Sequence, residues 1–198
     1  INTGNLRPQT EYEVEEGVLD LPEFYNDVRT LADVTDVDYF IPGCPPQTDR
    51  LVEVFMAVVT GAELPPKGSV IGAGTKAQCD ECIREKSENK KITKFYRPWE
   101  IVDDGKTCFM EQGILCMGPT TRTGCDYRCI KGNSPCKGCY GPTPDVSDPG
   151  AKMMSAIASI IDEKEPEAID KVIEDLVDPA GTFYRYSLPV SFIRRTVS

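Results

Sequence analysis

Cysteine thiols are the side chains of this chain with the clearest capacity for chemistry. Eight of the nine cysteines lie between residues 79 and 139, and their spacing includes two C-x2-C pairs. The eight are Cys79, Cys82, Cys108, Cys116, Cys125, Cys129, Cys136 and Cys139. Thiolates at such spacing bind iron–sulfur clusters or zinc, and two four-thiolate sites require eight of them. The spacing therefore favours iron–sulfur ligation.

Two other uses of the cysteines stay open at this point. An odd number of cysteines in 198 residues suits a disulfide framework poorly, and such frameworks are usually smaller. A zinc ribbon pairs two C-x2-C motifs about 15–20 residues apart, whereas 53 residues separate Cys82 from Cys136. A compact four-thiolate zinc site over 125–139 is compatible with the spacing. The chain has no histidine, so His-dependent catalysis and His–metal sites are excluded from it.

Charge and hydropathy narrow the class of partner. The chain has 22 basic and 32 acidic residues and a net charge of −10. Nucleic acids and anionic membranes attract cationic faces, so neither is expected as a partner. No apolar run approaches the ~18 residues of a membrane span. We therefore expect a soluble, cytoplasmic protein with no membrane association.

The first third of the chain has the pattern of an α/β unit. We expect a helix over 21–32, a strand over 37–41, and a further helix with Thr48 or Asp49 as its N-cap. The apolar stripe of this second helix is Leu51, Val54, Phe55, Val58 and Val59. Cys44 lies in the Pro-Gly-Cys-Pro-Pro turn between strand and helix, at the strand's carboxyl end, where open α/β sheets bind ligands. A lone cysteine there is otherwise a small core residue.

The remainder is expected to be irregular around the cysteines. A linker over 63–68 precedes a polar helix over 76–90, which places Cys79 and Cys82 on one face. Frequent Gly and Pro keep 103–150 in loops, whose amide N–H groups can point at cluster sulfurs.

Two amphipathic helices and an apolar tail are expected to close the chain. The helices cover 149–163, with Met154 and Ile157 inward, and 166–177. The tail over 183–193 either folds back on the domain or docks a partner. At the other end, the chain begins at Ile1 and its first residues show no capping or strand pattern. We therefore expect a fragment of a longer protein.

Three motifs in order resemble the small, electron-transferring subunits of nickel–iron hydrogenases. They are Gly-Cys-Pro-Pro at 43–46, Cys-Met-Gly-Pro at 116–119 and Pro-Cys-Lys-Gly-Cys at 135–139. The likeness covers residue 37 to the end. It is strongest to the gamma subunits of the methyl-viologen-reducing hydrogenases of methanogens, which work with heterodisulfide reductase.

The resemblance implies an α/β fold with two parts. Residues 1–64 would be the C-terminal part of a flavodoxin-like domain, and 65–198 an irregular, loop-rich iron–sulfur domain with a few helices. In the family, the cysteine of Gly-Cys-Pro-Pro is the last ligand of a proximal 4Fe–4S cluster. Cys44 matches it, and the three earlier ligands would lie upstream. We therefore expect Cys44 to face an interface or an upstream segment, without a complete site of its own.

The resemblance also implies which thiolates share a cluster. The distal cluster would take Cys79, at a position where many relatives have His, with Cys82, Cys108 and Cys116. The medial cluster would take Cys125, Cys136 and Cys139. Cys129 adds a fourth thiolate, which favours 4Fe–4S over the 3Fe–4S centre of many relatives. Thiolates in place of imidazole favour low potentials.

The function implied is that of a non-catalytic electron relay in an oxidoreductase complex. Electrons from hydrogen oxidation in the nickel–iron large subunit would pass through the clusters to an iron–sulfur subunit linked to heterodisulfide reductase. No residue of this chain is expected to act as acid, base or nucleophile. The alternatives are a zinc-binding structural or interaction protein and a stand-alone iron–sulfur carrier, although the ferredoxin run C-x2-C-x2-C-x3-C-Pro is absent.

Overall fold

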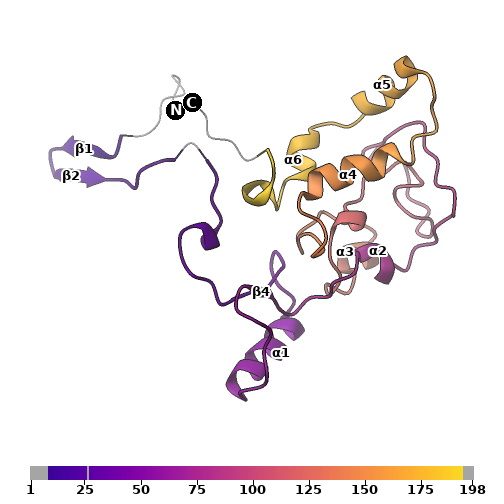
Figure 1. The fold of residues 1–198 in the computed structure, drawn as a ribbon. Helices are drawn as coiled ribbons and strands as arrows, with labels where there is room; N and C mark the ends of the chain where they lie inside the picture. Colours follow the sequence, from indigo (N-terminus) through magenta and orange to yellow (C-terminus); the bar gives the residue numbers. More distant parts are fainter. Residues whose placement is uncertain (1–8, 26, 194–198) are drawn as a thin grey trace.

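The N-terminal part of the chain forms a separate hairpin. The computed structural model describes residues 9–25 and 27–193. Strands β1 (Glu11–Val14) and β2 (Gly17–Asp20) pair antiparallel, with Val14 opposite Gly17, and Figure 1 shows them away from the helices of the body. The sequence prediction of no strand here was wrong, since Glu-Tyr-Glu-Val alternates polar and apolar residues as a strand does.

The helix expected over 21–32 is also not formed by the described residues of that range, 21–25 and 27–32. Only a 3-10 turn, η1 (Leu31–Asp33), forms there, and the Thr30 side chain caps it by accepting the Asp33 N–H. Phe24 and Leu31 are exposed, so an amphipathic helix at this place would have no surface to cover. Short helices depend on such packing for their stability.

A small parallel βαβ unit follows. Strand β3 (Tyr39–Phe40) and strand β4 (Ser69–Val70) are joined through helix α1 (Thr48–Val59) and pair in parallel, with Tyr39 opposite Ser69. The predicted strand and helix are confirmed, and β4 is an addition. A two-stranded pair is too small to identify a flavodoxin-like sheet, so that part of the fold prediction stays a prediction, as does the domain division at residue 64.

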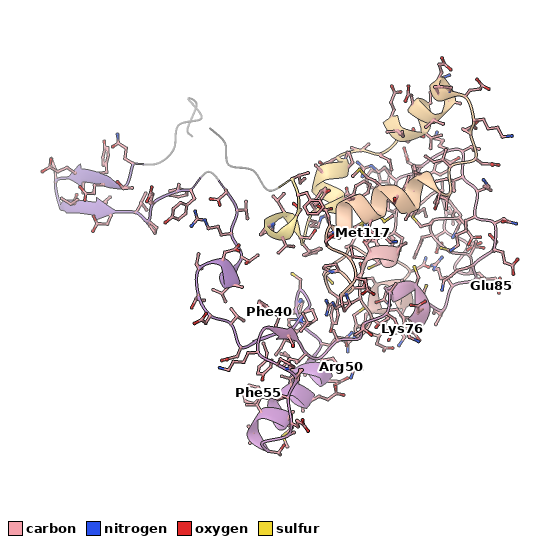
Figure 2. All side chains as sticks on the ribbon, in the orientation of Figure 1. Phe40, Arg50, Phe55, Lys76, Glu85 and Met117 are labelled. Carbon is pink, nitrogen blue, oxygen red and sulfur yellow. The ribbon has the colours of Figure 1, made fainter. Side chains whose placement is uncertain are left out.

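The apolar stripe of α1 lies uncovered in the part of the chain that the structure describes. Phe55, labelled in Figure 2, is 71% exposed and Val59 is 72% exposed. The helix begins without a side-chain cap after Gln47, so the expected cap at Thr48 or Asp49 was wrong. It ends at Val59, and Gly61, directly after the cap residue Thr60, has a φ of +67° that suits glycine.

The cysteine-bearing region contains only short elements. They are α2 (Gln78–Glu81), the 3-10 turn η2 (Gly118–Thr120) and α3 (Arg128–Lys131). The polar helix predicted over 76–90 was therefore too long. It ends because Cys82 has extended backbone angles and the next buried side chain, Arg84, turns inward. The expectation of a loop-rich region is confirmed.

Three helices and a turn complete the fold. They are α4 (Pro149–Ala158), α5 (Pro166–Glu174), α6 (Pro179–Phe183) and the 3-10 turn η3 (Leu188–Val190). Figure 1 shows α4 and α6 beside the loop region that carries α2 and α3. Among the described residues, no helix has both the length and the apolar character needed to cross a bilayer.

Helix α4 is the centre of the core. The side chain of Asp148 caps it by accepting the Ala151 N–H at 2.8 Å. Met153 is fully buried and Ile157 nearly so, whereas Met154 is 51% exposed. The predicted inward face was therefore right for Ile157 and wrong by one residue at Met154.

The C-terminal tail folds back on this core. Phe183 and Tyr184 are buried. The ring of Tyr184 lies where a Cβ on Gly150 would come within 2.1 Å of it, so only glycine allows this approach. Of the two roles left open for the tail, the structure confirms packing on the domain.

A buried ion pair fixes the loops around the cysteines. The guanidinium of Arg84 donates to both carboxylate oxygens of Asp103, at 2.5 and 2.8 Å, and its side chain is 3% exposed. It also donates to the Thr107 carbonyl and to Asn133, and it stacks 3.6 Å from the centre of the Phe109 ring. One side chain thus ties together three loops that lie far apart in sequence.

Asp103→Asn is expected to destabilise the fold by about 3 kcal/mol at neutral pH, because it leaves the Arg84 charge buried and unpaired. The hydrogen bond from Arg84 lowers the pKa of Asp103 to about 2. The pair therefore stabilises the wild type above the carboxyl's ordinary pKa, and the stabilisation is lost as the pH falls toward 2. Urea unfolding from neutral to acidic pH measures both effects.

Glu85→Gln is the matched control, since Glu85 pairs with Lys106 at 3.2 Å while both side chains are more than 60% exposed. Its cost should stay below about 1 kcal/mol. Equal losses in the two variants would contradict the role assigned to the buried pair.

Candidate metal centres

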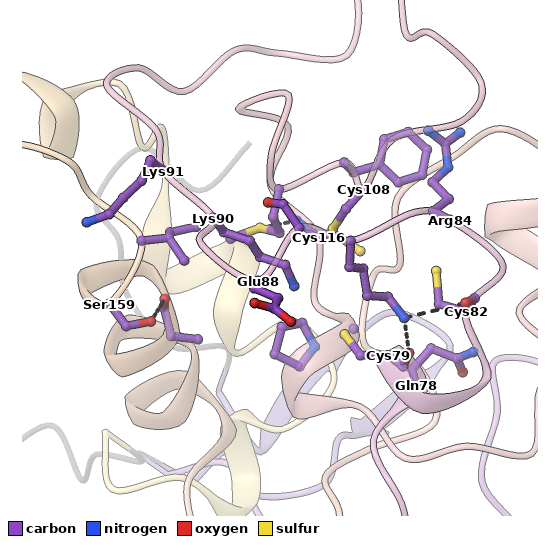
Figure 3. Close-up of a pocket in the computed structure, with 18 of the residues that line it drawn as sticks. Gln78, Cys79, Cys82, Arg84, Glu88, Lys90, Lys91, Cys108, Cys116 and Ser159 are labelled. Atoms are coloured by element: carbon purple, nitrogen blue, oxygen red, sulfur yellow. Dashed lines mark hydrogen bonds between the residues drawn. The ribbon is translucent and has the colours of Figure 1, made fainter.

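The cysteines line two separate cavities. The first, of about 490 Å³, is lined by Cys79, Cys82, Cys108 and Cys116, and Figure 3 shows their sulfurs around it. The second, of about 280 Å³, is lined by Cys125, Cys129, Cys136, Cys139 and Cys44. All nine thiols are free, so no disulfide joins any of them. Each of the two groups implied by the family resemblance thus lines one cavity, with Cys44 added to the second, and their assignment as cluster ligands stays a prediction.

The wall of the first cavity is built closely around its sulfurs. Cys79 lies on α2 and Cys116 just before η2, and both approach Gly118. A Cβ on Gly118 would lie 3.1 Å from the sulfur of Cys79 and 3.6 Å from that of Cys116. Because Gly118 has no side chain, the sulfurs of Cys79 and Cys116 can occupy these positions.

Lysines compensate for the burial of this site. The ammonium of Lys86 donates to the carbonyls of Cys79 and Cys82, drawn as dashed lines in Figure 3. Burial raises the pKa of the Cys79 thiol to about 11, the neighbouring Cys108 adds to this, and the charges of Lys86 and Lys90 oppose it. Binding a metal must therefore displace a firmly held proton.

Backbone N–H groups point at sulfurs in both cavities. Burial raises the pKa of the Cys125 thiol to about 11, and the N–H of Tyr127 opposes this shift. Burial also raises the pKa of Cys136, which the N–H of Gly138 opposes. Tyr127 has a positive φ of 39° and Gly138 one of 92°, so the local turns direct these donors. Such N–H groups stabilise the thiolate form.

The two cavities share a wall. The N–H of Cys136, whose thiol lines the second cavity, donates to the sulfur of Cys116 in the first at 3.3 Å. Gln78 lines both cavities. Its side chain is 2.9 Å from the sulfur of Cys125, and the next residue in the chain is Cys79.

Cys44 does not behave as a core cysteine. It is exposed, it lines the second cavity as a fifth thiol, and its N–H approaches the sulfur of Cys139. The sequence placed Cys44 near a strand end but did not anticipate this neighbourhood. Its assignment to a separate proximal cluster stays a prediction.

The donor set fits iron–sulfur clusters. Within residues 9–25 and 27–193, no three Cys, Asp or Glu side chains converge closely enough to hold one metal ion. Four thiols line the first cavity and five line the second, and four thiolates are the ligand number of a 4Fe–4S cluster. Two buried side-chain atoms without a hydrogen-bond partner, Gln78 Nε2 and Tyr140 Oη, both belong to residues lining the second cavity.

Known proteins resemble this chain over most of its length. The iron–sulfur subunit of the F420-non-reducing hydrogenase of Archaeoglobus profundus, its G subunit, is 39% identical over 98% of the chain and 60% of its own length. The G subunit of the same kind of hydrogenase from Methanothermobacter thermautotrophicus is 40% identical over 90% of the chain and 58% of its own length. That from Methanothermus fervidus is 47% identical over 58% of the chain and 93% of its own length.

The chain belongs to the family of F420-non-reducing hydrogenase G subunits. Hydrogenases are oxidoreductase complexes, and the relatives are named as their subunits. The chain spans about 60% of the length of the first two relatives. No family model matches it.

The sequence did not reveal which residues lie next to the cysteine sulfurs. Gly118, Lys86 and Gln78 act through positions that only the folded loops define. The Gly after Cys-Met at 116–117 belongs to a noticed motif, yet nothing in the sequence links it to Cys79. For Gln78, residue type and spacing carry no signal.

Gly118→Ala is expected to weaken the first site selectively. The backbone of Gly118 tolerates alanine, but the added Cβ displaces the Cys79 sulfur at a cost of about 1–3 kcal/mol. Affinity for a bound metal group should fall roughly tenfold or more. Metal content and EPR of each site measure this, with Gly132→Ala, whose Cβ meets only carbonyls at 3.4 Å, as control. Full occupancy of the first site in Gly118→Ala would contradict the tight fit.

Proposed function

We propose that this chain is the electron-relay subunit of a nickel–iron hydrogenase. The observation that carries the proposal is the division of its thiols between two adjacent cavities, together with its membership of the family of hydrogenase G subunits. One relative is named as an iron–sulfur subunit. A 4Fe–4S cluster bound in each cavity would supply one-electron redox chemistry, and the chain itself would be non-catalytic.

Each cavity would hold its cluster through four thiolates. Cys125, Cys129, Cys136 and Cys139 would bind the medial cluster. Cys79, Cys82, Cys108 and Cys116 would bind the distal one. Cys44 would complete a proximal cluster with three thiolates from an upstream segment. Its exposure beside the second cavity supports a proximal cluster next to the medial one.

The relay would connect two partners. A nickel–iron large subunit would oxidise hydrogen, and an iron–sulfur subunit linked to heterodisulfide reductase would accept the electrons. The shared wall at Gln78 and Cys136 supports direct transfer between the medial and distal sites. Nine free thiols support a reducing compartment, so we place the protein in the cytoplasm.

A zinc-binding structural protein is the alternative, in which each group of four thiolates would hold one zinc ion at about 2.3 Å. A stand-alone iron–sulfur carrier would share the sites and lack the large subunit.

Anaerobic purification with elemental analysis tests the proposal. We expect about eight iron atoms and eight sulfides per chain, with EPR signals from two reducible sites. Zinc at either site would overturn the proposal. Co-purification of a nickel-containing subunit, identified by mass spectrometry, separates the relay from the stand-alone carrier, for which no such subunit would be recovered.

Cys129→Ser is expected to convert the medial site from four irons to three, because three thiolates are the ligand set of a 3Fe–4S centre. The midpoint potential of that site should rise, and electron transfer onward should slow. EPR with redox titration measures the change. An unaltered spectrum would show that Cys129 is no ligand or that Cys44 replaces it.

The double variant Cys44→Ser/Cys129→Ser decides between these two explanations. If Cys44 had replaced Cys129, the double variant would lose the four-iron signal that the single variant kept. If the four-iron signal persists in both, Cys129 is not a ligand.

A further inference from the structure

Gln78 is the most deeply buried polar side chain near the two cavities. It is 1% exposed, and its backbone N–H donates to the Thr121 carbonyl at 2.6 Å. Figure 3 shows its side chain directed away from the sulfur of Cys79 in the first cavity. The side chain instead contacts Cys125 in the second cavity. One residue therefore lies between the two candidate metal centres.

The hydrogen bond of Gln78 changes character when Cys125 loses its proton. In the free thiol, Cys125 Sγ–H donates to Gln78 Oε1 at 2.9 Å, and the amide nitrogen Nε2 has no partner. A metal-bound thiolate is an acceptor only. The arrangement would then place two acceptors, Oε1 and sulfur, against each other.

A half-turn of the amide removes this conflict. Exchange of Oε1 and Nε2 requires no movement of the rest of the side chain, because the two positions have nearly the same shape. The nitrogen that lacks a partner in the free-thiol form then becomes the donor to sulfur. An unpartnered buried N–H is energetically costly. The amide N–H of Gln78 gains a partner once Cys125 is a thiolate, so the free-thiol structure already contains the donor that the thiolate requires.

We propose that Gln78 donates a side-chain hydrogen bond to the metal-bound Cys125 thiolate and thereby raises the midpoint potential of the second site relative to the first. The proposal rests on the proposed function. Reduction adds negative charge to the cluster and its sulfurs, so a donor to sulfur stabilises the reduced form more than the oxidised one. Gln78 acts as a positioning residue and changes no protonation state in the one-electron step.

The geometry also makes Gln78 a direct link between the sites. From the Cys125 sulfur, one hydrogen bond leads to the Gln78 side chain, and the backbone of Gln78 continues into Cys79. The Cys136 N–H to Cys116 bond runs between the same two cavities. Gln78 is the half of this wall that substitution can remove without loss of a candidate ligand, since the other bond joins a backbone N–H to the sulfur of Cys116.

Gln78→Met and Gln78→Leu test the proposal. Methionine keeps the length of the side chain and leucine excludes any role of a thioether, while neither has an N–H. The test is EPR-monitored redox titration of the anaerobic chain. The equilibrium constant for transfer of an electron from the first site to the second should fall about tenfold. This is 59 mV for a one-electron couple. The potential of the first site should remain unchanged.

Gln112→Leu is the matched control. Its amide donates to Asp103 and to the Thr107 carbonyl, and not to a cysteine sulfur. It should leave the potential of the second site as in the wild type. An equal shift in Gln112→Leu would mean that loss of an amide away from the cysteines also perturbs the second site, and it would overturn the assignment.

The outcomes separate this inference from the proposed function. A wild-type chain without iron–sulfur signals would defeat the proposed function itself. A wild type with two clusters and Gln78 variants of unchanged potential would defeat only the role of Gln78. If circular dichroism shows that one of the two Gln78 variants does not fold, the potential of the other variant tests the inference. Loss of the second cluster from a folded variant would also overturn the tuning role, since Gln78 would then be required for assembly.

Discussion

The burial of sulfur atoms in a chain with few regular elements is the constraint on which this structure depends. A buried thiolate loses its hydration, and burial, helped by neighbouring cysteines, raises the pKa of Cys79 and Cys125 to about 11. The fold opposes this with N–H groups from tight turns and with lysines at the rim of the first cavity. Irregular backbone suits that task, because helices and strands use their N–H groups among themselves. The loops are thus the part of the fold that holds the sites.

The order of the cysteines, together with the family resemblance, predicted which of them lie together. Neighbouring thiols in a loop-rich segment of sixty residues have few ways to converge, and the two cavities divide them as expected. Helices α4 and α5 were predictable for a different reason, since Asp148 and two prolines mark their starts and apolar residues recur at helical spacing. That the thiols bind clusters, and that Cys44 serves a third one, remains a prediction.

Other features depend on tertiary contacts that the sequence does not express. A single extended residue, Cys82, ends α2 where charge patterning favoured a longer helix. In α4, Met153 rather than Met154 faces the core. The contact between Gln78 and Cys125 spans 47 positions. Neither residue type nor spacing could have indicated it.

The unequal exposure of the two cavities has a consequence for damage by oxygen. Cys116 is buried in the first cavity, whereas Cys129 and Cys44 are exposed at the second. Accessible thiolates are the ones that oxidants convert to sulfenic and higher acids. In the isolated chain, the second site is therefore where oxidation begins. If the two sites transfer electrons in series, oxidation at the second site stops the transfer while the first site stays intact. A partner that covers Cys129 and Cys44 would therefore also protect the second site from oxidants.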